Sequence, residues 1–143
     1  MQVCMESSAR TRPFAQRVRD GLLAEIDRAL RSQDIEALSR LYAEDAVIEE
    51  VSNRDPPAHP SVTSGRQAIL ERLKSDLFHD PVSGWSRQLD ATEIVDGIET
   101  DDGLAFLEVR IYAAGDRVIA QHLARKKGGL IGHDRVLVVW DAK

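Results

Sequence analysis

The chain has 143 residues, of which 43% are hydrophobic and 30% charged, and its formal net charge is -5. This length fits one domain that buries about two thirds of the surface exposed by the unfolded chain. The acidic balance argues against the basic surface of a nucleic-acid-binding protein. Because no apolar run approaches about 18 residues, we expect no membrane-spanning segment.

The single cysteine and the N-terminal segment indicate the cellular location of the protein. Cys4 cannot form an internal disulfide, and no apolar leader is present, which favours a reducing, cytoplasmic location. Residues 1–12 lack periodicity and are expected to form a flexible tail, followed by a single domain over residues 13–143. The four histidines show no zinc-ligand spacing, and no glycine-rich phosphate loop is present, so we expect neither metal nor cofactor.

Three segments have the pattern of amphipathic helices. The first starts at Pro13 and repeats apolar residues every four positions as far as Leu30; Gly21 inside it marks either a close helix crossing or a tolerated defect. The second is capped by Asp34 and carries a buried stripe that includes Tyr42, before the pattern breaks at residues 44–45. The third begins at the capping-box spacing of residues 64–67 and ends near residue 80.

A short strand is predicted directly after the second helix. From Ala46 the apolar period changes to two, so that Ala46, Ile48 and Glu50 share one face and residues 47, 49 and 51 share the other. Either face therefore combines a carboxylate with two apolar residues. The following residues, 53–60, contain three prolines and form a loop, which is either a lid over a cavity or a surface loop without a role.

The second half of the chain predicts four strands in succession, over residues 86–95, 104–113, 117–126 and 134–141. Turn signals at residues 101–103, 114–116 and 127–129 favour antiparallel hairpins. The layout is α+β, with helices over one face of a sheet. Residues 136–139 are apolar without interruption, so the last strand is expected to be covered on both faces. A second subunit, giving a homodimer through the sheets, is the predicted cover; an overhanging tail or loop is the alternative.

Two motifs carry a resemblance to a known family. The run from Gln33 through Leu41-Tyr42-Ala43-Glu44-Asp45-Ala46-Val47, followed by Gly65-Arg66-Gln67-Ala68-Ile69, resembles the nuclear transport factor 2-like superfamily, in particular its SnoaL-like and ketosteroid-isomerase-like members. The resemblance spans residues 14–141. It implies a cystatin-like cone in which three N-terminal helices pack on a curved, mostly antiparallel sheet around an apolar cavity. Members differ widely in activity, so function must be argued from the site.

Glu50 is the first candidate catalytic residue. The resemblance places it where ketosteroid isomerases carry a catalytic aspartate, although its side chain is one methylene longer. A glutamate beside Ala46 and Ile48 would be poorly solvated, which raises a carboxylate's pKa towards the range useful for acid–base chemistry. The alternative is that Glu50 lies in water at the end of the strand or pairs with an arginine.

A second polar group is needed to hold a developing oxyanion. In the resemblance, the tyrosine that serves this purpose falls near Ile26, and the acid falls at Gln121 or His122. These departures disfavour steroid isomerisation by that mechanism but leave dehydration, cyclisation or aldol-type proton transfer. If the bulkier residues 119 and 123 face the cavity, Gln121 points inwards and His122 towards a partner subunit; if alanines 120 and 124 make room for a ligand, the reverse holds.

The strand over residues 104–113 has one purely apolar face. Its other face carries Phe106, Glu108, Arg110 and Tyr112, and predicts a Glu108–Arg110 pair on the surface; the alternative is a polar array that lines the cavity and ends at Tyr112. Limonene-type epoxide hydrolases carry an Arg-x-Asp pair on such a strand. Here Tyr112 stands in the place of the aspartate, which disfavours epoxide hydrolysis.

These observations lead to one hypothesis and one rival. The hypothesis is a cofactor-independent acid–base enzyme, of isomerase, cyclase or dehydratase type, with Glu50 as base and Gln121 or His122 polarising the oxygen of a small hydrophobic carbonyl compound such as a polyketide or steroid-like ring. The rival is a non-catalytic module that binds an apolar ligand or dimerises. The residues expected to contact a ligand are Tyr42, Ile48, Trp85, Phe106, Tyr112, Val138 and Trp140.

Overall fold

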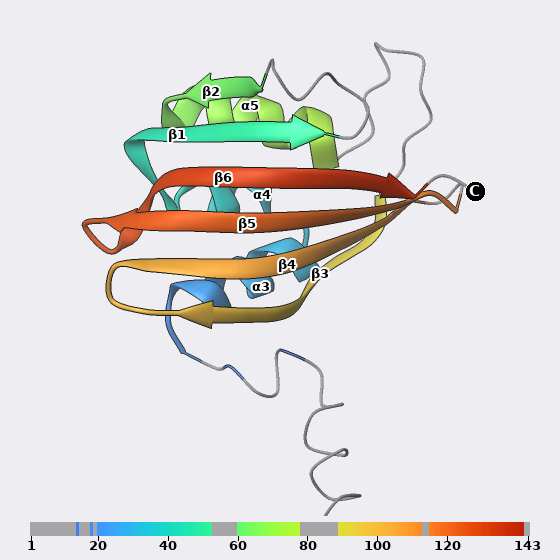
Figure 1. The fold of residues 1–143 in the computed structure, drawn as a ribbon, viewed down its shortest axis with the longest axis horizontal. Coiled ribbons are helices and arrows are strands. Elements are labelled where there is room, and N and C mark those ends of the chain that lie inside the picture. Colours follow the sequence, from blue (N-terminus) through green and yellow to red (C-terminus); the bar gives the residue numbers. More distant parts are fainter. Residues whose placement is uncertain are drawn as a thin grey trace, which may run out of the picture.

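The computed structural model describes residues 14, 18, 20–52, 60–77, 89–112 and 115–141 (Figure 1). Within these ranges, three helices and six strands follow one another in an α+β arrangement. The helices are α3 (Leu22–Arg31), α4 (Ile35–Ser39) and α5 (Arg66–Leu77). The strands are β1 (Tyr42–Ser52), β2 (Ser61–Ser64), β3 (Leu89–Glu99), β4 (Gly103–Tyr112), β5 (Arg117–Lys127) and β6 (Leu130–Asp141).

The strands form one sheet in the order β2-β1-β6-β5-β4-β3. Strands β3 to β6 pair antiparallel with their neighbours in the sequence, which confirms the predicted hairpins. Strand β1 returns beside β6 in the parallel direction, and β2 pairs antiparallel with β1 at the edge. The helices lie behind the sheet in Figure 1, so they cover one of its faces as predicted. We call this helix-covered side the inner face and the opposite side the outer face.

The boundary between the second helix and the first strand differs from the prediction. Asp34 caps α4 as expected, because its Oδ1 accepts a hydrogen bond from the Ala37 amide at 3.0 Å. The helix, however, ends at Ser39, and β1 already begins at Tyr42. The Leu41 carbonyl accepts from the Ile131 amide of β6 at 2.9 Å. Pairing with a strand far along the chain therefore overrides the local helical pattern.

The predicted first helix is interrupted at Gly21, where φ is 96°. Helix α3 starts immediately afterwards, and the Glu99 carboxylate from β3 accepts hydrogen bonds from the amides of Leu22 and Leu23 at 3.1 and 2.8 Å. A Cβ atom at Gly21 would lie 2.8 Å from Glu99 Oε1. Gly21 is thus neither a helix crossing nor a defect, since it admits the carboxylate that caps the helix.

The two faces of the sheet differ in burial. Val136 and Val138 point into the core and are buried, whereas Leu137 and Val139 on the outer face are 47% and 41% exposed. The cover predicted for the outer face is therefore not supplied by the described residues around β6. None of the described helices has both the length and the apolar character needed to cross a membrane.

Several predictions concern residues outside the described ranges. These are the N-terminal tail over residues 1–12, the proposed lid over most of residues 53–60, and the ligand contact expected of Trp85. Strand β2 was not predicted, because its four residues carry no clear alternation of apolar and polar side chains.

Candidate functional site

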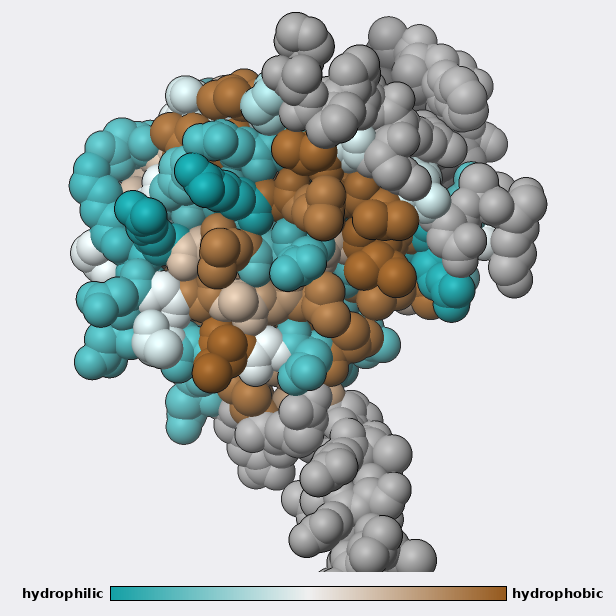
Figure 2. All heavy atoms as spheres, viewed as in Figure 1, coloured by the Kyte–Doolittle hydropathy of each residue, from teal (hydrophilic) through white to brown (hydrophobic). Residues whose placement is uncertain are grey.

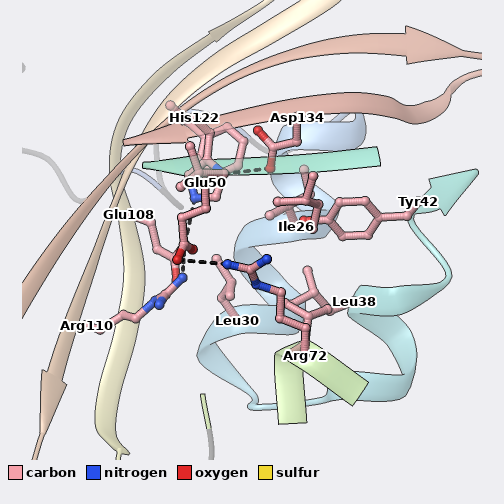
Figure 3. Close-up of a pocket in the computed structure, with 14 residues that line it drawn as sticks. Ile26, Leu30, Leu38, Tyr42, Glu50, Arg72, Glu108, Arg110, His122 and Asp134 are labelled. Carbon is pink, nitrogen blue, oxygen red and sulfur yellow. Dashed lines mark hydrogen bonds and ion pairs between the residues drawn. The ribbon is translucent and has the colours of Figure 1, made fainter. Parts of the chain in front are cut away.

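A cavity of about 30 Å³ lies between the inner face of the sheet and the three helices (Figure 3). This volume holds about two water molecules. Its apolar lining comes from Ile26, Leu30, Leu38, Ile48, Leu73, Phe106 and Val136. Its polar lining comes from Tyr42, Glu50, Arg72, Glu108, Arg110, His122 and Asp134.

His122 lies at the centre of the polar lining. Its Nδ1 is 2.8 Å from Asp134 Oδ2, and its Nε2 is 2.8 Å from Glu108 Oε1. The ring of Phe106 stacks on the imidazole with a centroid separation of 4.2 Å and an interplanar angle of 8°. Both ring nitrogens thus face carboxylates, an arrangement that an imidazolium satisfies by donating two hydrogen bonds.

Charge and burial act in opposite directions on this cluster. Burial alone would lower the pKa of His122, but the charges and hydrogen bonds of Asp134 and Glu108 outweigh it and raise that pKa to about 9. Burial would likewise raise the pKa of Glu108, but the Arg110 guanidinium and His122 hold it well below its usual range. The lining of the cavity therefore contains a protonated histidine, His122, at neutral pH.

Glu108 has partners besides the histidine. Arg110 Nε donates to its Oε2 at 2.8 Å, and Thr92 Oγ1 donates to the same oxygen at 3.2 Å. Burial raises the pKa of the Tyr42 hydroxyl well above its usual value, and the negative charges of Asp134 and Glu108 add to this effect. Tyr42 is consequently a neutral hydroxyl within the cavity.

The Glu50–Arg72 ion pair lies at the more open end of the cluster. Arg72 Nη2 is 2.9 Å from Glu50 Oε2, and the two side chains are 15% and 19% exposed. Arg72 also donates from Nη1 to Ser61 Oγ at 3.0 Å and to Thr63 Oγ1 at 2.6 Å. Glu50 therefore lines the cavity and pairs with an arginine, which combines the two alternatives left open by the sequence.

Strand register fixes the relation between Glu50 and His122. Glu50 on β1 lies opposite Val136 on β6, which in turn lies opposite His122 on β5. Two strand spacings separate the backbones of Glu50 and His122 by about 10 Å. Figure 3 shows both side chains directed towards the cavity. A small group bound between them could reach both.

Comparison with known proteins places this geometry in a fold family. Neither a family model nor a curated protein matches the chain. Several solved structures do match it in fold. An NTF2-like protein of unknown function from Burkholderia xenovorans LB400 has a TM-score of 0.64 at 12% identity, with 85% of this chain and 83% of that chain covered.

Two further solved structures are similar to this chain over most of its length. A candidate ketosteroid isomerase from Kribbella flavida has a TM-score of 0.59 at 16% identity, with 85% of this chain and 76% of that chain covered. A candidate polyketide cyclase from Sinorhizobium meliloti has a TM-score of 0.58 at 20% identity, with 85% and 97% covered. The chain has the nuclear transport factor 2-like fold. These identities are too low to transfer an activity to it.

Within this nuclear transport factor 2-like fold, the structure decides one alternative left open by the sequence and corrects one prediction about the strands. Gln121 points to the outer face and is exposed, whereas His122 is buried beside the small residues Ala120 and Ala124. The bulkier apolar residues of β5 mark the outer face and not the cavity. The Glu108–Arg110 pair is likewise buried on the inner face, so the alternative of a polar array is the correct one.

The predicted ligand-contacting residues divide into three groups. Tyr42, Ile48 and Phe106 line the cavity. Tyr112 and Val138 are buried on the same inner face outside this lining, and Trp140 stacks on Tyr112 at a centroid separation of 5.7 Å. The remaining one, Trp85, lies outside the described residues.

Two site residues, Arg72 and Asp134, were missed by the sequence reasoning. Asp134 Oδ2 orients His122, while Oδ1 is buried without a hydrogen-bond partner. Asp134, Val136 and Val138 are alternate residues of β6 and so lie on the same face of the sheet. This alternation could have predicted that the Asp134 carboxylate points inwards with the two valines. In the described ranges, no group of three or more His, Cys, Asp or Glu side chains is arranged to hold a metal ion.

Proposed function

We propose that this protein is a cofactor-independent acid–base enzyme of the isomerase, cyclase or dehydratase type, acting on a small carbonyl compound with an apolar body. The observation that carries the proposal is the buried His122, held between two carboxylates in a cavity whose lining is half apolar and half polar. Such a site stabilises negative charge that develops on a substrate oxygen and excludes bulk water.

The Nε2–H group of His122 is the proposed donor to the substrate oxygen. Glu108 retains Arg110 and Thr92 as partners when a ligand takes over this hydrogen bond. Asp134 Oδ2 has His122 as its hydrogen-bond partner and keeps the imidazolium in place through Nδ1. The two ring nitrogens thus have separate tasks: Nδ1 positions the ring and Nε2 contacts the substrate.

Glu50 is the proposed base. When its carboxylate turns from Arg72 to a carbon-bound proton, Arg72 remains held by Ser61 and Thr63 on β2. The proton passes from the substrate carbon to Glu50, and the enolate oxygen that forms is stabilised by the imidazolium of His122. Return of that proton from Glu50 to another carbon gives isomerisation. If Glu50 instead gives the proton to a β-hydroxyl, the C–O bond breaks, water leaves and the enolate electrons form the new C=C bond, which completes dehydration.

The volume of the cavity limits the size of the substrate group that can enter it. A volume of about 30 Å³ admits the carbonyl end of a molecule but not a steroid-like ring. The apolar body of the substrate is therefore proposed to lie at the end formed by Glu50 and Arg72, which are the more exposed members of the cluster.

One observation favours the rival function, a module without catalytic activity. The charged groups of the cavity form ion pairs with one another, and the open space holds only about two waters. A protein that uses the cluster only to stabilise its fold would have this arrangement.

Exchange of carbon-bound hydrogen for deuterium distinguishes the two functions without knowledge of the product. A panel of small ketones and β-hydroxy ketones is incubated with the protein in D₂O and followed by NMR. We expect accelerated exchange next to the carbonyl for at least one compound. Glu50→Gln should slow it by about 10²- to 10⁴-fold, since the general base is lost.

Glu49→Gln is the matched control, because Glu49 precedes Glu50 on β1 but pairs with His133 on the outer face. Exchange should persist in this variant. Thermal shifts by the panel in the absence of any exchange, equal in the native protein and in Glu50→Gln, would support the binding module and reject the enzyme.

A further inference from the structure

One carboxylate oxygen in the lining of the cavity has no hydrogen bond. Asp134 is 1% exposed, and its Oδ2 is 2.8 Å from His122 Nδ1, whereas its Oδ1 is buried without a partner. Among the described residues, Oδ1 is the only buried side-chain nitrogen or oxygen atom in this state. A buried acceptor without a donor destabilises the folded state by the cost of its desolvation, and this cost is larger for a charged group. A bound molecule that donates to Oδ1 removes this cost. The outer face of the sheet, whose middle carries exposed apolar side chains in Figure 2, has no comparable buried polar atom among its described residues.

The cations of the lining are engaged elsewhere. Arg110 Nε and His122 Nε2 each lie 2.8 Å from an oxygen of Glu108, and Arg72 Nη2 lies 2.9 Å from Glu50 Oε2. With the histidine protonated, the three cations of the lining balance its three carboxylates. A charged ligand group would upset this balance in a buried place, where an unpaired charge is costly. The group that donates to the open oxygen is therefore expected to be neutral.

The Tyr42 hydroxyl is the neutral polar group of the same lining. The Tyr42 backbone carbonyl accepts from Arg66 Nε at 2.9 Å, but the hydroxyl has no partner in the described part of the chain. Burial, and next to it the charge of Asp134, raises the pKa of this hydroxyl, so it stays protonated beside the carboxylate. Figure 3 shows the Tyr42 ring directed into the cavity that Asp134 also lines.

Strand register brings Tyr42 and Asp134 to the same place from neighbouring strands. Tyr42 on β1 lies opposite Ile131 on β6, and Asp134 follows Ile131 by three residues. The two backbones are therefore about 11 Å apart, from one strand spacing across the sheet and three residues along it. From this separation both side chains can contact one small group between them.

An acceptor beside a donor is complementary to a hydroxyl group. A hydroxyl donates its hydrogen to a carboxylate oxygen and accepts a hydrogen bond from a phenol. A carbonyl oxygen has no hydrogen to donate, and an ammonium group has no lone pair to accept with and adds a charge. The pair formed by Asp134 Oδ1 and the Tyr42 hydroxyl thus favours an alcohol over either of these groups.

We propose that Asp134 Oδ1 and the Tyr42 hydroxyl form a second subsite of the cavity, which binds an uncharged hydroxyl group of the substrate. The inference rests on the proposed function for the carbonyl group at His122 Nε2, and it narrows the substrate to a hydroxy ketone. The hydroxyl lies on the Nδ1 side of the imidazole, whereas Glu50 lies at the more open end of the cluster. It is therefore a recognition group, distinct from a hydroxyl that Glu50 would protonate.

Matched pairs of uncharged ketones test the subsite. In each pair a methyl group replaces the hydroxyl: 4-hydroxybutan-2-one with pentan-2-one, and 4-hydroxycyclohexanone with 4-methylcyclohexanone. Dissociation constants are measured by NMR titration of isotope-labelled protein, which requires no turnover. In at least one pair the hydroxy compound should bind about tenfold more tightly or better, although it is the less apolar member, because the methyl compound leaves Oδ1 without a donor.

Two variants assign this preference to the subsite. Tyr42→Phe removes only the phenolic oxygen, and should weaken binding of the preferred hydroxy compound by about three- to tenfold while leaving its methyl counterpart within about twofold. Asp134→Asn should reduce the preference within the pair to about threefold or less, since the open acceptor is lost. Its effect on His122 acts on both members of a pair, so the ratio of their dissociation constants isolates Oδ1. Tyr112→Phe is the matched control, because Tyr112 is a buried tyrosine of the inner face outside the lining, and it should retain the preference.

The results separate this inference from the proposed function. Thermal melts verify that each variant is folded. Equal binding within both pairs would show that water stays at Oδ1 and would overturn the inference; so would a preference unchanged in both variants, or no binding of any of the four ketones. A hydroxyl preference without deuterium exchange supports the subsite and rejects the enzyme, whereas exchange without a hydroxyl preference rejects the subsite alone.

Discussion

Two histidine–carboxylate contacts of equal length lie on opposite faces of the same sheet. His122 and Glu108 are 2.8 Å apart on the inner face, with side chains 7% and 3% exposed. His133 and Glu49 are also 2.8 Å apart, but their side chains are 32% and 36% exposed. The outer contact is screened by water, whereas the inner one belongs to a buried network with Arg110 and Asp134. Burial and further partners, not distance, therefore separate a site suited to chemistry from an ordinary surface contact.

The largest expected difference between the two contacts is in stability. Glu108→Gln leaves the cations of His122 and Arg110 buried without their shared carboxylate, and should lower the free energy of unfolding by about 3–5 kcal/mol. Glu49→Gln, its counterpart on the outer face, should cost about 1 kcal/mol or less. Urea unfolding at pH 7 measures both. Equal losses in the two variants would show that the inner network is no stronger than the surface pair.

The second expected difference is in the response to pH. The pKa of His122 is raised to about 9 in the folded protein, so protonation of His122 favours the folded state. The stability gained is complete below about pH 6.5, the ordinary pKa of histidine, and is lost as the pH rises through about 9. Thermal unfolding between pH 6 and 10 should show this loss. It should be absent in His122→Gln and retained in His133→Gln; a native profile that coincides with that of His122→Gln contradicts the assignment.

The smallest expected effect concerns the aromatic ring over the imidazolium. Phe106→Leu removes the stacked ring, and with it a favourable cation–π contribution of about 1–2 kcal/mol. The pKa of His122, followed by NMR, should fall, because the charged form loses this contact. Leu107→Ala, at the next residue and on the outer face, is the control and should leave the His122 titration in place. A titration unmoved by Phe106→Leu would mean that the stacking is incidental.

The parts of the fold that depend on local signals were predictable. The hairpins of β3 to β6 follow from alternation and turn residues, and Asp34 caps its helix as the sequence indicated. The end of α4 was not predictable, because Tyr42 enters a strand only through its pairing with β6. A local pattern cannot show which distant segment will compete for the backbone.

Only part of the site was predictable, again because a local pattern does not show what packs against it. Alternation along β5 shows which residues share a face, but not which face is covered by helices. His122 and Gln121 were therefore both candidates, and the sizes of their neighbours on β5 could be interpreted either way. Arg72 joins the site through contacts with β1 and β2 that a helical pattern does not reveal. The lid, the ligand contact of Trp85 and the cytoplasmic location stay predictions.

The cap of helix α3 has a consequence for biosynthesis. The carboxylate that receives the first amides of this helix belongs to Glu99, which is 77 positions beyond Leu22. When the ribosome has just completed Arg31, that carboxylate does not yet exist in the nascent chain. The start of α3 can therefore take this capped form only after β3 has been translated, so a helix made before all six strands depends on one of them for its cap.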